Sequence, residues 1–431
     1  MTSSAEKRRP SRRHSHNRLT AGRATRPAAP SLSRLMRAIT VLAVALAGLG
    51  WTASAAHADA RTIHLSILKC QFSDDTTHDV PGSPITTDEQ IADFLANAGT
   101  DGVPDFVSQF SDGRLVLDSR ISGWYTMPTT LAADPSIDTS RRVQDCIDTA
   151  QRAGWSLPAG NKLVVFRNRC ADRGTESSNW VLLDPCSTFT QSARDIASIT
   201  TGLRGSSDDP WSLTGTGNVF TQPSRWGPKP VGPNGFQQSI TGLPFTYWPT
   251  RTAGQVTLAP LYGSPGTTLP RVVVLPHIEG ANPTNIYNLI LEYRYPQGLD
   301  APIGAPVVLI HRQTYGYTEV MRGADGRPAQ DVVVGNQHVH VVSTGGSTAT
   351  VSIDTAYGLP RVPDVIGASR ADGSRTVLAA GLAVSLNSST EPTCDQLGQV
   401  VAQRPDAGTV VDPGSRVFLT IATKPAKGCS L

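Results

Sequence analysis

The chain has 431 residues, of which 17% are charged, with 38 Lys and Arg against 35 Asp and Glu. Much of the excess positive charge lies in the N-terminal segment, so the formal net charge of +3 gives no support to a nucleic-acid partner. The length suggests two or three domains, and 39 Gly with 32 Pro predict a protein rich in loops and strands.

Residues 1–58 have the three successive regions of a secretory signal peptide. A basic stretch over 1–37 precedes an apolar run from Ala38 to Trp51, and Ala56-His57-Ala58 offers small side chains for cleavage. The apolar run is shorter than the roughly 20 residues of a membrane span. We therefore expect a secreted protein that starts at Asp59 and does not stay inserted in a membrane. An uncleaved N-terminal anchor is the alternative.

Six cysteines follow this segment, and an even number in a secreted chain indicates disulfides. They are Cys70, Cys146, Cys170, Cys186, Cys394 and Cys429. The last two stand far from the others and are expected to pair. The first four allow three connectivities, of which we favour Cys70–Cys146 with Cys170–Cys186. Because there is no Cys-x-x-Cys motif and no Cys/His cluster, we expect no structural zinc.

The segment 59–215 mixes strands and helices, which predicts an α/β layered domain. Apolar alternation, or a short apolar run, marks the strands, and capping residues with helical spacing mark the helices. The predicted strands cover 63–72, 114–121 and 162–166. The predicted helices cover 87–98, 103–110, 141–153 and 190–203.

Helical periodicity nearly vanishes over 216–356, where Gly and Pro are dense. Short strands separated by turn residues are typical of a β-sandwich or a barrel-like module. The predicted strands cover 256–258, 271–275, 289–295, 307–311, 338–343 and 348–353. A linker over 357–361 leads to a compact unit over 362–424, and a tail over 425–431 ends the chain. The whole is an α+β multidomain protein.

Several short motifs occur in a fixed order between residues 63 and 355. Ser122-Gly123-Trp124-Tyr125-Thr126-Met127-Pro128 is the most specific of them. Leu68 to Asp74 precedes it, and Asp209 to Gly215 and Leu291 to Ile310 follow it. In this order they resemble the immune inhibitor A and gametolysin-like family of secreted metallopeptidases. The resemblance implies a metzincin-like domain followed by a β-rich module.

The residues that would bind zinc in such a peptidase are replaced in this chain. An active zinc peptidase needs His-Glu-x-x-His on a helix, with two imidazoles on one face and the Glu as general base. In the frame of the resemblance these positions are Arg194, Asp195 and Ser198, and Thr214 replaces the Met beneath the zinc. The resemblance therefore implies a degenerate domain without catalytic, cofactor-binding or metal-binding residues. The alternative is that 190–203 is an ordinary amphipathic helix.

The last unit carries several spaced motifs over some 60 residues. Val362-Pro363-Asp364-Val365-Ile366-Gly367 opens it, a helix over 371–380 ends at Gly381, and 400–417 completes it. These motifs resemble the PASTA domain, which is attached to cell-wall-sensing kinases and penicillin-binding proteins. The resemblance implies one helix on a three-stranded sheet, and either binding of peptidoglycan fragments or a role as a spacer.

The histidines suggest a second hypothesis. His338 and His340 lie two residues apart on one strand face, a spacing that can chelate a metal. No Asp, Glu or third His stands nearby in sequence, so solvated histidines are the favoured interpretation, and His277 and His311 are isolated.

We therefore expect a secreted, cell-wall-associated pseudoenzyme without cofactor. It would be monomeric, with peptidoglycan or muropeptides as partners and no nucleic acid. The alternatives are an active extracellular hydrolase with a non-standard site built on these histidines, and a surface structural protein.

Overall fold

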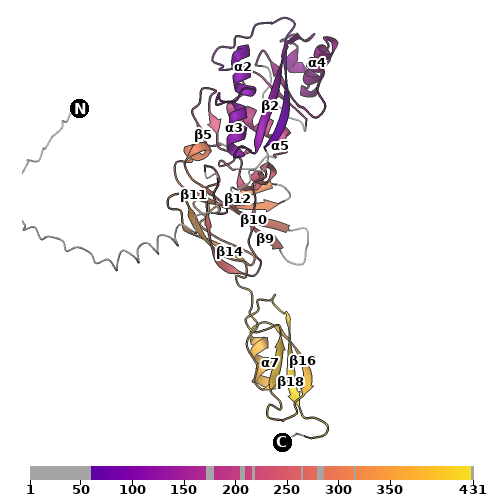
Figure 1. Ribbon diagram of the computed structural model, residues 1–431, viewed down its shortest axis with the longest axis vertical. Coiled ribbons are helices and arrows are strands. Elements are labelled where there is room, and N and C mark those ends of the chain that lie inside the picture. The colour runs from indigo at the N-terminus through magenta and orange to yellow at the C-terminus, as the bar shows by residue number, and fades with distance from the viewer. Residues whose placement is uncertain are drawn as a thin grey trace, which may run out of the picture. The chain divides into compact units, whose positions relative to one another are not determined.

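The computed structural model describes residues 60–170, 179–203, 209–215, 219–263, 266–278, 286–314 and 317–428 (Figure 1). The predicted signal peptide, 1–58, lies outside the described residues. Among the helices that the structure describes, none has the length and apolar character to cross a membrane.

A parallel sheet of four strands, in the order β2-β1-β3-β4, organises the first part of the chain. Parallel neighbours need crossover connections, and helices supply them here. The strands are β1 (Arg61–Gln71), β2 (Leu115–Thr126), β3 (Lys162–Arg167) and β4 (Trp180–Leu183). The helices are α2 (Asp88–Leu95), α3 (Val103–Phe110), α4 (Thr139–Arg152) and α5 (Phe189–Thr201), with a 3₁₀ turn, η1, at Asp134–Ser136.

Both faces of this sheet are buried, which explains the continuous apolar run of β3. Val164 and Phe166 face one way, into a core that also holds side chains from α2, α3 and α5. Leu163 and Val165 face the other way, towards α4. The disulfide Cys70–Cys146 joins β1 to α4, and Cys170–Cys186 joins the segments after β3 and β4, so both favoured pairings are confirmed.

The second part is built from two antiparallel-rich sheets that share one core. The five-stranded sheet has the order β12-β11-β10-β9-β7, and the four-stranded sheet has the order β13-β14-β15-β8. The first contains β7 (Thr246–Tyr247), β9 (Val272–Ile278), β10 (Ile286–Arg294), β11 (Val307–Thr314) and β12 (Tyr317–Val320). The second contains β8 (Ala253–Leu258), β13 (Asp331–Val334), β14 (Gln337–Ser343) and β15 (Ala349–Asp354).

The outer face of the five-stranded sheet is also covered. Val272, Val274 and Ile290 point away from the other sheet and join the core that contains the α2, α3 and α5 side chains. Short elements of the intervening segment lie between α5 and β7. They are β5 (Thr221–Gln222), β6 (Lys229–Pro230), α6 (Gly235–Gln238) and η2 (Ser239–Thr241); η3 (Gly298–Ile303) follows β10. The predicted boundary at 215/216 stays a prediction.

The C-terminal unit is one helix on a three-stranded sheet, as its motifs implied. Its elements are α7 (Arg370–Ala379), β16 (Ala383–Thr390), β17 (Val400–Arg404) and β18 (Arg416–Thr423), in the sheet order β16-β18-β17. Val377 of α7 and Leu419 of β18 meet in its core. Cys394 is disulfide-bonded. Cys429 lies outside the described residues, so their pairing stays a prediction.

Together these elements make a mixed α/β protein of several sheets. The finer expectation of a metzincin-like fold stays a prediction. Six strands were not predicted. β4, β12 and β13 have four residues each, and β5, β6 and β7 have two each, which is too short for a period to be recognised.

Candidate functional site

Helix α5 carries Arg194, Asp195 and Ser198, the three positions that the resemblance assigns to the zinc ligands and the general base of a peptidase. Thr188 caps its first turn by accepting from the Gln191 amide, and Gly202 ends it with a left-handed φ of 78°. Asp195 is 1% exposed, and its Oδ1 lies 3.1 Å from Nε of Arg194. Ser198 is half-buried. Arg194 thus supplies the counter-charge of its neighbour, and this set has no imidazole to offer a metal.

Thr214, the residue in the Met position, lies in a closed hydrogen-bond network after α5. Its hydroxyl accepts from the side-chain amide of Gln237 and lies 3.3 Å from Oγ of Ser212. Ser212 in turn donates to Oε1 of Gln237 at 2.9 Å. A Cβ at Gly215 would lie 2.2 Å from the carbonyl oxygen of Asp209, so this turn requires glycine. The loop is held by buried polar side chains.

Five buried ionisable side chains form what we call the Asp209–His311 cluster. It comprises Asp209, Glu292 and Arg294 of β10, Asp300 of η3 and His311 of β11, each at most 1% exposed. Nε of Arg294 lies 2.8 Å from Oδ2 of Asp300, and its Nη1 lies 3.2 Å from Glu292. Nε2 of His311 lies 3.4 Å from Glu292, and its Nδ1 lies 3.9 Å from Asp209. Two cations therefore face three carboxylates out of contact with water.

The start of helix α6 closes one side of the cluster. Nδ2 of Asn234 donates to Oδ2 of Asp209 at 3.1 Å, and the amide of Gly235 donates to Glu292. A Cβ at Gly235 would lie 2.5 Å from Oε2 of Glu292, so a larger residue could not approach as closely. The cluster thus joins the loop after α5 to the outer face of the five-stranded sheet.

Burial and charge compete in setting the pKa values of this cluster. Burial alone would lower the pKa of His311, but Glu292 and Asp209 outweigh it and raise that pKa. Burial would raise the pKa of Glu292, yet His311 and Arg294 bring it below its usual value. Burial prevails at Asp209 and Asp300, whose pKa values are raised. The two carboxylates thus favour the charged form of the imidazole.

His311 has no partner close to it along the chain, and the fold supplies its partners. Its partners come from a neighbouring strand and from a loop about a hundred residues earlier. A signal was present nonetheless: Glu292 and Arg294 alternate with apolar residues on a strand that is largely apolar. Charged residues at such positions, two apart, are typical of a buried pair.

His338 and His340 lie on one face of β14, as predicted, but they have a carboxylate beside them. Nε2 of His338 is 3.1 Å from Oδ1 of Asp331, and Nδ1 of His340 is 2.8 Å from Oδ2. The hydrogen bond from His340, followed by that from His338, lowers the pKa of Asp331 against the opposing effect of burial. The expectation that no acid stands near was wrong, because β13 was not recognised. His277 lies apart, on β9.

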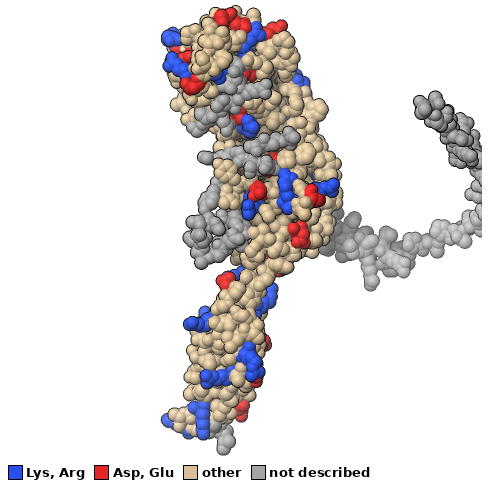
Figure 2. Space-filling model, turned by 180° about the vertical axis from the view of Figure 1, so that it is seen from behind, with Lys and Arg blue, Asp and Glu red and all other residues tan. Residues whose placement is uncertain are grey.

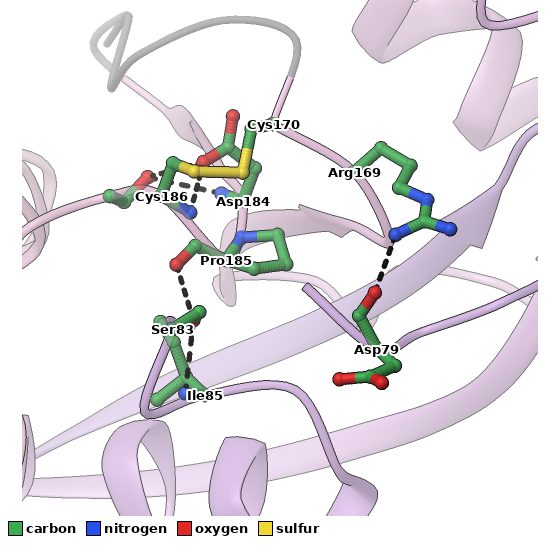
Figure 3. Close-up of a disulfide and its surroundings, with 9 residues drawn as sticks. Asp79, Ser83, Ile85, Arg169, Cys170, Asp184, Pro185 and Cys186 are labelled. Carbon is green, nitrogen blue, oxygen red and sulfur yellow. Dashed lines mark hydrogen bonds between the residues drawn. A yellow bond between two sulfur atoms is a disulfide. The ribbon is translucent and has the colours of Figure 1, made fainter. Parts of the chain in front are cut away.

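A close group of two sulfurs and a carboxylate occurs at Cys170, Cys186 and Asp184 (Figure 3). Its sulfurs are joined in a disulfide and are not thiolate ligands, so the group does not form a metal site. Asp184 accepts the amide of Cys186 at 2.8 Å, and Ser83 donates to the carbonyl of Pro185 at 2.5 Å. The disulfide and these bonds fix the turn before α5.

Figure 2 shows one face of the molecule, on which uncharged residues cover most of the area and charged side chains of both signs are scattered.

Comparison with known proteins identifies the C-terminal unit. Residues 360–423 match the PASTA domain family, so this unit is a PASTA domain. The matched part is a small share of the chain, and the comparison gives no support to the metallopeptidase resemblance of the earlier segment, which stays a proposal.

Two curated relatives are similar over short stretches. The chain is 34% identical over 79 residues to a probable serine/threonine-protein kinase PknB of Corynebacterium glutamicum. It is 32% identical over 82 residues to a probable serine/threonine-protein kinase of Corynebacterium efficiens. These stretches are 18% and 19% of this chain and 12% of each relative. The chain therefore matches about an eighth of each relative's length.

Proposed function

We propose that this is a secreted, cell-wall-associated protein that binds peptidoglycan through its PASTA domain. The carrying observation is the PASTA domain at 360–423, with its helix on a three-stranded sheet. The two disulfides of the first part suit an oxidising compartment outside the cytoplasm. The basic, apolar and small-residue regions of residues 1–58, which follow one another as in a signal peptide, also support export from the cytoplasm.

In this proposal the metallopeptidase-like part performs no zinc-dependent hydrolysis. The residues at the three metal positions support this proposal. Arg194 pairs with the buried Asp195, and neither Arg194 nor Ser198 is a zinc ligand. The part then acts as a folded body that the PASTA domain holds near the wall.

Sedimentation tests the wall association. The chain from Asp59 onward is mixed with insoluble purified peptidoglycan, centrifuged and quantified in pellet and supernatant. We expect it in the pellet, with serum albumin in the supernatant. A chain that stays in the supernatant at all protein concentrations contradicts the proposal.

An active hydrolase with a non-standard site is the second candidate, and the contact of both His338 and His340 with Asp331 favours it. Its test is the zinc content of the chain from Asp59 onward after equilibration with zinc and desalting. The first proposal predicts no retained zinc. One zinc per chain that is lost in His338→Ala/His340→Ala would favour the hydrolase instead.

A further inference from the structure

The PASTA sheet has one face that no helix covers. Side chains of β18 alternate, so Val417 and Leu419 enter the core with α7 while Phe418 points to the other face. Phe418 is 41% exposed although it lies near the middle of the central strand. A phenyl ring at the centre of a small open sheet is the feature from which this inference starts.

The strand register defines the neighbours of this ring. Ser385 of β16 lies opposite Phe418 on one side, and Arg404 of β17 lies opposite it on the other. Two residues along β18 in either direction are Arg416 and Thr420. Residues directly opposite or two apart share a face, so these side chains surround the ring. We call Ser385, Arg404, Arg416, Phe418 and Thr420 the open PASTA face.

The open PASTA face combines small polar groups with two guanidinium groups. Arg404 and Arg416 are both exposed, and among the described residues neither has a recorded ion-pair partner. None of the five positions is acidic. Gln403, on the opposite side of β17, is fixed by bonds to Val365 and Pro363, which sets the direction of Arg404. The face is therefore aromatic at its centre and cationic beside it.

We propose that the open PASTA face is the surface that binds peptidoglycan, which rests on the proposed function above. The ring of Phe418 packs on the apolar face of a pyranose, because the small neighbours Ser385 and Thr420 leave the ring accessible. Arg404 and Arg416 pair with carboxylates of the peptide stem, for which the planar guanidinium is well matched. An uncharged glycan satisfies only the first contact, so peptidoglycan is the occupant with the better charge match.

The test compares binding of variants of the chain from Asp59 onward to insoluble peptidoglycan. We expect Phe418→Ala to weaken binding about tenfold, which corresponds to about 1.4 kcal/mol, and Phe418→Trp to retain it because the indole keeps an aromatic face for the sugar. Leu378→Ala is the matched control, because Leu378 is 59% exposed on α7 and should bind as the unaltered chain does. Equal unfolding temperatures show that all variants fold.

The arginines are tested through salt and through chitin, which has similar sugars but no peptide. Arg404→Gln/Arg416→Gln should weaken peptidoglycan binding and remove most of its salt dependence, and leave any chitin binding unchanged. If the unaltered chain binds peptidoglycan and Phe418→Ala binds equally well, the open PASTA face is not the site although the proposed function stands. If the unaltered chain does not bind, the proposed function fails.

Discussion

His311 shows how a few buried charges connect distant parts of this chain. It lies between Glu292 and Asp209, while Arg294 lies between Glu292 and Asp300. Taking such groups out of water is costly, so the pairs must be complete to be tolerated. On α5, Arg194 likewise supplies a counter-charge to the buried carboxylate of Asp195.

We predict that His311→Ala lowers the free energy of unfolding by about 3–5 kcal/mol, because it leaves Asp209 buried without this cation and Glu292 with Arg294 alone. Denaturant unfolding at pH 6 measures this loss. His340→Ala is the control, since His340 pairs with Asp331 at the surface and such pairs contribute about 0–1 kcal/mol. A loss at His311 as small as that at His340 would contradict the account.

His311 also makes the stability of the folded chain depend on pH. Its pKa is higher in the folded chain than the ordinary value of 6.5, so its stabilisation is complete below that pH and is lost as the pH rises through the folded-state value. Glu292 has a lowered pKa, so its contribution is lost only in acid. We expect stability to fall as the pH rises above 6.5. His311→Gln should flatten this profile, and an unchanged slope would argue against a charged imidazole.

At the scale of elements, local patterns predicted most of the first part. The strand over 63–72, the helix over 103–110 and the helix over 141–153 match β1, α3 and α4 closely, because apolar periodicity and capping are local signals. β13 was not predicted, and with it the partner of His338 and His340 was lost. The spacing of residues along the chain does not show which strands lie side by side. For this reason neither carboxylate–histidine group could be predicted from the sequence.

The Cys70–Cys146 disulfide links β1 to α4. We expect Cys70→Ala/Cys146→Ala to cost about 2–5 kcal/mol of stability, because the disulfide closes a separation of 76 residues and both cysteines are fully buried. Cys170→Ala/Cys186→Ala is the comparison, with a separation of 16 residues and a smaller expected loss. Urea unfolding without reductant measures both, and a reversed order would show that loop closure does not dominate.

At the scale of the whole molecule, the PASTA domain has a core of its own. All its buried apolar residues lie between Val362 and Ala422. The part built on the parallel sheet carries the two disulfides, and the five-stranded sheet carries most of the Asp209–His311 cluster. In the proposed function, residues 360–423 hold the protein at the wall.

The most direct test compares the chain over 59–431 with a chain that ends at 356, in sedimentation with insoluble peptidoglycan. Because the PASTA core is separate, the shorter chain should keep its unfolding temperature and its disulfides. We predict that the full chain enters the pellet and the shorter chain stays in the supernatant. Equal sedimentation of the two chains would contradict the claim that the PASTA domain attaches this protein to the wall.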